Sequence, residues 1–125
     1  MSNYQAGACN IGPSEIKRRR QGALVGAILF AVTTILFVVT DASTSTRLVT
    51  FIPALLFAVG MIQSKRKFCV AYGFMGVFNF GKAGQMEKVR SSEEKAADRA
   101  TALSLLSHAM VIALAITGLI YFWPA

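Results

Sequence analysis

The chain has 125 residues, enough for one domain, and 54% of them are hydrophobic whereas only 15% are charged. Soluble domains carry about 25% charged residues, and a core of this size has no room for three long apolar runs. Composition therefore excludes a disordered chain and a soluble globular domain. The formal net charge of +7 would suggest nucleic acid as the partner of a soluble protein. A membrane protein instead sorts its basic residues by side, so we expect no nucleic-acid partner and no soluble substrate.

Three apolar runs are long enough to cross a membrane. The first, residues 22–40, contains no charged residue and as a helix would rise roughly 28 Å, close to the thickness of a hydrocarbon core of about 30 Å. The polar stretch 41–46 can only form a turn, so the second run, 47–63, is expected to return across the membrane. The third, 101–123, has room to tilt and ends in aromatic residues typical of the headgroup region. We predict an all-α integral membrane protein with three transmembrane helices and a single membrane domain, residues 1–125.

The basic residues are distributed asymmetrically about these spans. Segments 1–21 and 64–100 carry 12 of the 13 Lys and Arg residues, and the loop between the first two spans carries only Arg47. The positive-inside rule therefore predicts that segment 1–21 is cytoplasmic, that loop 64–100 is cytoplasmic or interfacial, and that the C-terminus is outside. We expect a bacterial inner membrane or another energy-transducing membrane.

Seven of these basic residues would gather beside the ends of the first two spans, and we call them the basic collar. We expect the collar to contact lipid headgroups, and docking of an acidic partner is the alternative. The collar consists of Lys17, Arg18, Arg19, Arg20, Lys65, Arg66 and Lys67.

Residues 68–80 read FCVAYGFMGVFNF and lack charge, yet as a helix they would rise only about 20 Å and could not cross. In a helix, Cys69, Gly73 and Gly76 would share one small face suited to packing on other helices. In a strand, apolar and aromatic side chains would alternate on one face. Because an unpaired strand edge has no partner in lipid, we prefer an interfacial or re-entrant helix between the second and third spans.

The last helix is expected to begin before it enters lipid. Ser91 and Glu94 form an S-x-x-E capping box about ten residues ahead of the third span. That helix would therefore project into the cytoplasm.

His108 is the only histidine and lies seven residues into the third span, with Thr101, Ser104 and Ser107 at helical spacings. Such a polar stripe in apolar surroundings needs partners. The plainer interpretation is a set of hydrogen bonds between helices. The alternative makes His108 an axial ligand of haem or of a chlorophyll-type pigment through a neutral imidazole nitrogen.

Few residues suggest other chemistry. Cys9 and Cys69 are 60 residues apart, show no metal-ligand spacing and are expected to be reduced thiols, so we predict no metal site. Apart from Arg47 at the first position of the second run, the spans contain no Asp, Glu, Lys or Arg. This composition argues against an enzyme, a proton pump or an ion-coupled transporter, which need positioned ionisable groups.

The spans also carry small residues that let helix backbones approach closely, together with one serine of the polar stripe. These helix-packing candidates are Gly22, Gly26, Ala54, Ala58, Ser104, Ala109 and Ala113. Three helices can use part of these faces within one chain, and the rest are expected to contact other integral-membrane subunits. We therefore predict a small structural or accessory subunit of a larger integral-membrane complex, with respiratory and photosynthetic complexes as candidates. The alternative is a subunit of an electron-transfer or light-harvesting system that binds a cofactor or pigment through His108.

Overall fold

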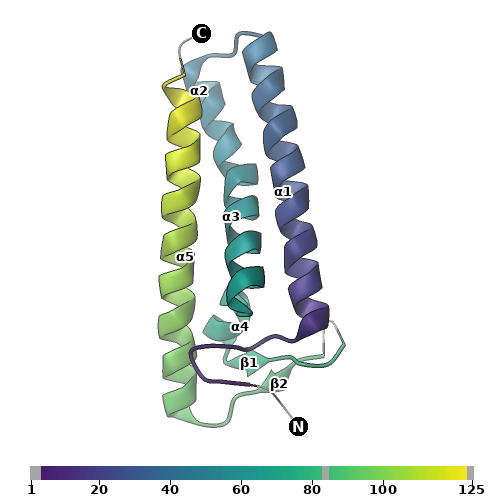
Figure 1. The fold of residues 1–125 in the computed structure, drawn as a ribbon. Helices are drawn as coiled ribbons and strands as arrows, with labels where there is room; N and C mark the ends of the chain where they lie inside the picture. Colours follow the sequence, from purple (N-terminus) through teal and green to yellow (C-terminus); the bar gives the residue numbers. More distant parts are fainter. Residues whose placement is uncertain (1–3, 83–84, 124–125) are drawn as a thin grey trace.

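The computed structural model describes residues 4–82 and 85–123 and consists mainly of three long helices that lie side by side (Figure 1). Each is long and apolar enough to cross a membrane, so the chain fits an integral membrane protein. The first is α1 (Pro13–Val39) and the last is α5 (Ser92–Tyr121). The middle one is formed by α2 (Thr44–Arg47), the 3-10 helix η1 (Leu48–Thr50) and α3 (Phe51–Arg66), which follow one another without a break.

Two of the helices extend beyond their apolar runs at the same end of the bundle, which we call the basic end. α1 begins at Pro13 and not near residue 22, because a proline is favoured in the first turn, where its missing N–H removes no helical hydrogen bond. α5 begins at Ser92, and the hydroxyl of Ser91 accepts hydrogen bonds from the backbone N–H groups of Glu93 and Glu94. The predicted capping box therefore marks the start of the last helix.

α3 lies between α1 and α5 and packs against both (Figure 1). Where α1 meets α3, a Cβ atom added to Gly26 would lie 2.6 Å from the backbone nitrogen of Phe57, and one added to Gly60 would lie 2.7 Å from that of Ala23. Only glycine allows this approach of the two backbones. Four alanines of the middle and last helices are also fully buried: Ala54, Ala58, Ala109 and Ala113.

The segment 68–80, expected as one interfacial or re-entrant helix, divides into two elements. α4 (Val70–Met75) ends at Gly76, whose φ of +72° is in the left-handed region that favours glycine. The strand β1 (Val77–Phe78) follows and pairs antiparallel with β2 (Glu87–Lys88). The strand edge therefore has a partner, which the sequence interpretation did not consider.

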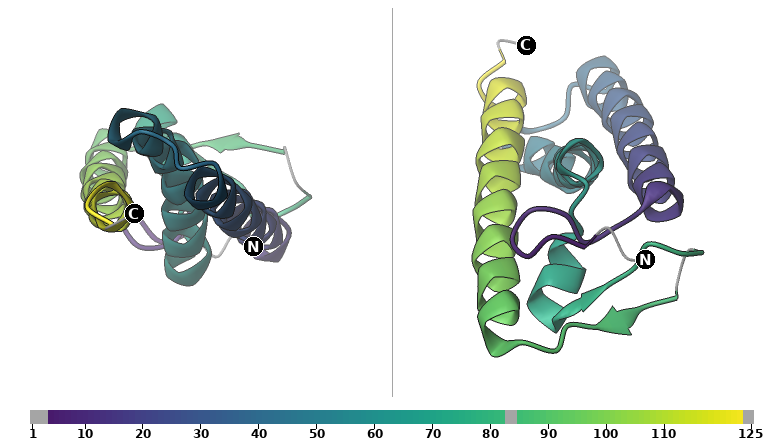
Figure 2. Two further views of the ribbon diagram at one scale, coloured as in Figure 1. Left: turned by 90° about the horizontal axis from the view of Figure 1, so that it is seen from above. Right: turned by 60° about the horizontal axis from the view of Figure 1, so that its bottom comes forward.

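The chain segments that connect the helices cover the basic end of the bundle. α4, β1 and β2 lie across this end of the bundle, and the segment that precedes α1 folds back over it (Figure 2). This segment joins the loop after β1 through a parallel bridge between Ile11 and Asn79. Its Ile11 packs with Cys69, Tyr72 and Val77 in a small hydrophobic core. The N-terminal and C-terminal ends lie at opposite ends of the bundle (Figure 1).

Candidate functional site

Glu15 is the centre of a buried polar cluster at the basic end. Its carboxylate is fully buried and accepts hydrogen bonds from the guanidinium groups of Arg18 and Arg19 at 3.3 and 3.1 Å. The hydroxyl of Tyr72 and the side-chain amide of Asn79 donate to its other oxygen, the amide at 3.2 Å. A buried carboxylate without such donors would cost several kcal/mol of stability, so these contacts explain why an acidic residue is tolerated here.

Arg19 connects this carboxylate to a buried thiol. Its second terminal nitrogen donates to Sγ of Cys69 at 2.9 Å, and its guanidinium carbon lies 5.4 Å from the centroid of the Tyr72 ring. Neither Cys69 nor the half-buried Cys9 forms a disulfide. We call Glu15 and the side chains that contact it or Arg19 the Glu15 cluster; its other members are Arg18, Arg19, Cys69, Tyr72 and Asn79.

Asn10 fastens the N-terminal segment to the start of α4. Its side-chain oxygen accepts the backbone N–H of Cys69 at 2.6 Å, and its amide donates to the carbonyl of the same residue at 3.2 Å. The backbone of Asn10 bonds on both sides as well, to the carbonyl of Lys67 and to the N–H of Asn79. One fully buried side chain therefore satisfies both backbone polar groups of Cys69.

A second buried carboxylate, Asp98 in α5, holds the beginning of the chain. It accepts the hydroxyl of Tyr4 at 2.5 Å and the backbone N–H of Gly7 at 2.7 Å, and Thr101 donates to the carbonyl of Gly7. Burial, together with the hydrogen bond to Asp98, raises the pKa of Tyr4. Burial and the hydrogen bond to Glu15 likewise raise the pKa of Tyr72. Both tyrosines are therefore held as neutral donors to buried carboxylates.

The contacts of these buried acids are made within the chain, which limits what they can do chemically. Glu15 is neutralised by two arginines, and Asp98 is covered by the N-terminal segment. In residues 4–82 and 85–123, no group of three or more His, Cys, Asp or Glu side chains could hold a metal ion. The arrangement suits a structural fastening of the basic end.

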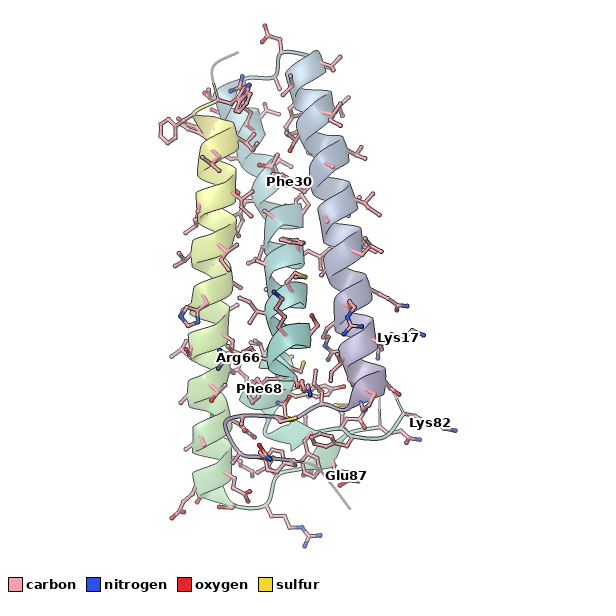
Figure 3. The ribbon with its side chains drawn as sticks, viewed as in Figure 1. Lys17, Phe30, Arg66, Phe68, Lys82 and Glu87 are labelled. Atoms are coloured by element: carbon pink, nitrogen blue, oxygen red, sulfur yellow. The ribbon has the colours of Figure 1, made fainter. Side chains whose placement is uncertain are left out.

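A groove of about 800 Å³ lies between α1 and α3 at the basic end. Its walls include Leu24, Phe57 and Met61, and three basic residues line it: Lys17, Arg20 and Lys67. All three cations are exposed, and none forms an ion pair within the part of the chain that the structure describes. Lys17 and Arg66, both members of the basic collar, project on opposite sides of α3 in the view of Figure 3.

The residues of the basic collar differ in their surroundings. Arg18 and Arg19 bond to Glu15, and only the side chain of Arg18 remains largely exposed, 57% against 16% for Arg19. The other five collar residues are exposed. Arg19 is therefore turned into the protein and away from the headgroup role expected of the whole collar.

His108 lies on the outward side of α5. His108, Ser104 and Ser107 are exposed, whereas the intervening Leu105 and the following Ala109 are buried. The hydroxyl of Ser107 donates to the carbonyl of Leu103 within its own helix. Over the described ranges, neither His108 nor Ser104 has a hydrogen-bond partner. Ser104, Ser107 and His108 thus face away from the bundle, whereas Thr101 of the same stripe bonds to the N-terminal segment.

The helix-packing candidates also differ in their surroundings. Gly26 and the four alanines are buried inside the bundle. Apart from the nearby backbone of its own helix and its chain neighbours, Gly22 has no atom within 4 Å of the position that a Cβ would take, and Ser104 is exposed. These two candidates are therefore available to surfaces outside the chain.

Sequence reasoning did not single out most of the buried polar residues. Asn10 lies in the predicted N-terminal cytoplasmic segment, Asn79 in the segment expected as an interfacial or re-entrant helix, and Asp98 in the predicted cytoplasmic extension of the last helix. One signal was available, because Glu15 is the only acidic residue within segment 1–21 and is followed by four basic ones. Comparison of the chain with models of known families, with curated proteins and with solved structures finds no match.

Proposed function

We propose that this chain is a small structural or accessory subunit of a larger integral-membrane complex and has no catalytic activity of its own. The observation that carries the proposal is the outward polar stripe of α5, in which Ser104 and His108 have no partner among the described residues. Respiratory and photosynthetic complexes are the candidate assemblies.

His108 lies well inside the predicted span, and this depth is why a missing hydrogen-bond partner matters. It lies seven residues into the predicted span, roughly 10 Å along the helix axis. Polar groups in hydrocarbon need hydrogen bonds, and ionisable side chains in spans almost always face protein or a water-filled cavity. A transmembrane helix of another subunit would supply the partner that the described residues do not provide.

The buried polar contacts at the basic end also support a structural role. Glu15 and Asp98 are buried and accept hydrogen bonds from residues of the same chain. Such contacts fix the connecting segments in one arrangement and leave neither carboxylate accessible to a substrate. A fixed, folded end is a suitable surface for contact with other subunits.

We further propose that the basic end faces the cytoplasm, with the C-terminus outside, in a bacterial inner membrane or another energy-transducing membrane. The charge asymmetry of the sequence is the support. Arg47, the one basic residue at the opposite end, is buried and donates to the backbone carbonyls of Ile120 and Trp123. Its charge is therefore directed at the carboxyl end of α5, where a cation is favourable.

The second candidate function is binding of haem or of a chlorophyll-type pigment through His108. The outward imidazole favours it, because an axial ligand must present a free ring nitrogen. A visible absorption spectrum of the purified complex separates the two functions. A band that His108→Ala abolishes would support the cofactor function, and an unchanged spectrum would support the accessory subunit.

Native electrophoresis after solubilisation in mild detergent tests the proposal. The wild-type chain should migrate in an assembly much larger than its own 13.5 kDa. A variant with His108→Leu and Ser104→Leu should be released, because it removes both unsatisfied groups. Ser107→Ala is the matched control and should stay assembled, since that hydroxyl already bonds within its helix. A free 13.5 kDa wild-type chain under every gentle condition would overturn the proposal.

A further inference from the structure

The groove between α1 and α3 has a largely apolar wall. It is also lined by three basic residues, which we call its rim: Lys17, Arg20 and Lys67. Lys17 and Arg20 lie on the first turns of α1, and Ala27 also lines the groove, about 15 Å from Lys17 along the helix axis. The wall between them is largely apolar. Ser64, a polar residue of the lining, already donates to the carbonyl of Met61 at 3.0 Å. The groove therefore runs from charged residues at the basic end toward the apolar part of α1.

The cations of the rim have no acidic partner in the described chain. Glu15 is the acidic residue nearest in sequence to Lys17 and Arg20, but it is buried and paired with Arg18 and Arg19. Lys17 and Arg20 lie on α1 and Lys67 directly follows the end of α3, yet all three line one groove. Three exposed cations that converge without a carboxylate are complementary to a phosphate group.

From this arrangement we infer that the groove binds one anionic phospholipid. Its phosphate would lie at Lys17, Arg20 and Lys67, and an acyl chain would lie along the wall formed by Leu24, Phe57 and Met61. A free phosphate would use the rim alone, whereas an amphiphile covers both the charge and the apolar wall. The volume of about 800 Å³ is within the range of small-molecule sites.

This lipid site is distinct from general contact between the basic collar and headgroups. It involves three of the seven collar residues and requires the apolar wall. It also lies on the α1 side of α3, whereas the polar stripe proposed to contact other subunits lies on α5. Either proposal can therefore fail without the other.

Native mass spectrometry of the purified full chain in mild detergent tests the site, with phosphatidylglycerol and phosphatidylcholine of identical acyl chains as probes. Wild type should retain one phosphatidylglycerol and bind phosphatidylcholine at least about tenfold more weakly. Replacing Lys17, Arg20 and Lys67 with Gln should weaken phosphatidylglycerol on the order of 100-fold. The matched control, with Gln at Lys65, Arg66 and Lys82, removes the same charge outside the groove and should bind as wild type.

A second pair of variants tests the acyl-chain part. Leu24→Ser makes the wall polar and should weaken phosphatidylglycerol roughly tenfold. Leu29→Ser, at a similarly exposed position of α1 that does not line the groove, should have no effect. Circular dichroism in the same detergent checks that each variant keeps its helices. The wild-type comparison of the two lipids and the wall variants keep the inference testable even if the rim variant does not fold.

Three outcomes would overturn the inference. Equal weakening by the rim variant and its charge-matched control would mean general attraction to the collar. Equal effects of Leu24→Ser and Leu29→Ser would mean that the apolar wall is not used. Displacement of the lipid by glycerol 3-phosphate at comparable concentration would mean a site for free phosphate, without an acyl-chain contribution.

Discussion

Arg18 and Arg19 both donate to the carboxylate of Glu15, but their surroundings differ. The side chain of Arg18 is largely exposed, whereas that of Arg19 is largely buried, bonds to Cys69 and stacks on Tyr72. A run of basic residues in a sequence does not indicate which of two neighbouring arginines is buried and which is exposed. Burial decides which arginine stabilises the fold, because screening by water makes an exposed ion pair weak.

Arg19→Gln should lower the free energy of unfolding by about 2 to 3 kcal/mol, since it removes hydrogen bonds to a buried carboxylate and a buried sulfur. Arg18→Gln should change it by less than about 1 kcal/mol. Unfolding of both variants in detergent with an increasing fraction of SDS, followed by circular dichroism, measures the difference. Equal losses of unfolding free energy in the two variants would contradict the different roles assigned to Arg18 and Arg19.

The raised pKa of Tyr72 should make the free energy of unfolding fall at high pH. Burial and the bond to Glu15 raise the pKa of its phenol above the ordinary 10.0. The unfolded chain therefore releases this proton first as the pH rises, so the stabilisation is complete below about pH 10 and is lost as the pH rises through the folded pKa. Tyr72→Phe should be less stable than wild type near neutral pH but should lose less stability above about pH 10. Thermal unfolding across this range checks it, and parallel curves would refute it.

The elements divide into those that the sequence predicts and those that it does not. The three long helices follow from apolar length, and the start of α5 follows from its capping box. The early start of α1 and the division of 68–80 into α4 and β1 were missed. Apolar length marks the part of a helix that lies in lipid and says nothing of its extension into water. The strand depends on pairing with residues 87–88, and no local pattern reveals that partner.

Gly26 and Gly22 test how α1 packs on α3. Gly26→Ala should destabilise the bundle by about 1 to 3 kcal/mol, because the new Cβ would meet the backbone of Phe57 at 2.6 Å. Gly22→Ala is the matched control on the same helix and should be tolerated, since no atom lies within 4 Å of its Cβ position apart from the nearby backbone of its own helix and its chain neighbours. SDS-induced unfolding of the two variants compares them. A control as destabilised as Gly26→Ala would mean that the packing is not the cause.

At the scale of the whole molecule, the arrangement of the basic end could not be predicted from the sequence. Its hydrogen bonds join Asn10 to Cys69 over 59 positions and Glu15 to Tyr72 over 57. Contacts of this separation have no periodicity that a single sequence would show. The orientation of Ser104 and His108 was likewise open, because spacing places them on one face of a helix without stating what that face meets.

The proposed orientation of the whole chain rests on its charge asymmetry. A reporter that is active only in the cytoplasm should give a signal when it is inserted after Gln85 and none when it is fused to the C-terminus, because basic loops are retained inside. The insertion site lies in the exposed part of loop 64–100. The reverse pattern of signals would contradict the proposed orientation.

Photo-crosslinking in native membranes tests the accessory-subunit proposal most directly. A photoreactive residue at position 108 should form a covalent product with a different membrane protein, because this position is expected to face another subunit. The same residue at Ile28, an exposed position of α1 that lies outside the groove, is the control and should give lipid adducts. Only lipid adducts at position 108, or only a product of twice the chain's own 13.5 kDa, would contradict the account.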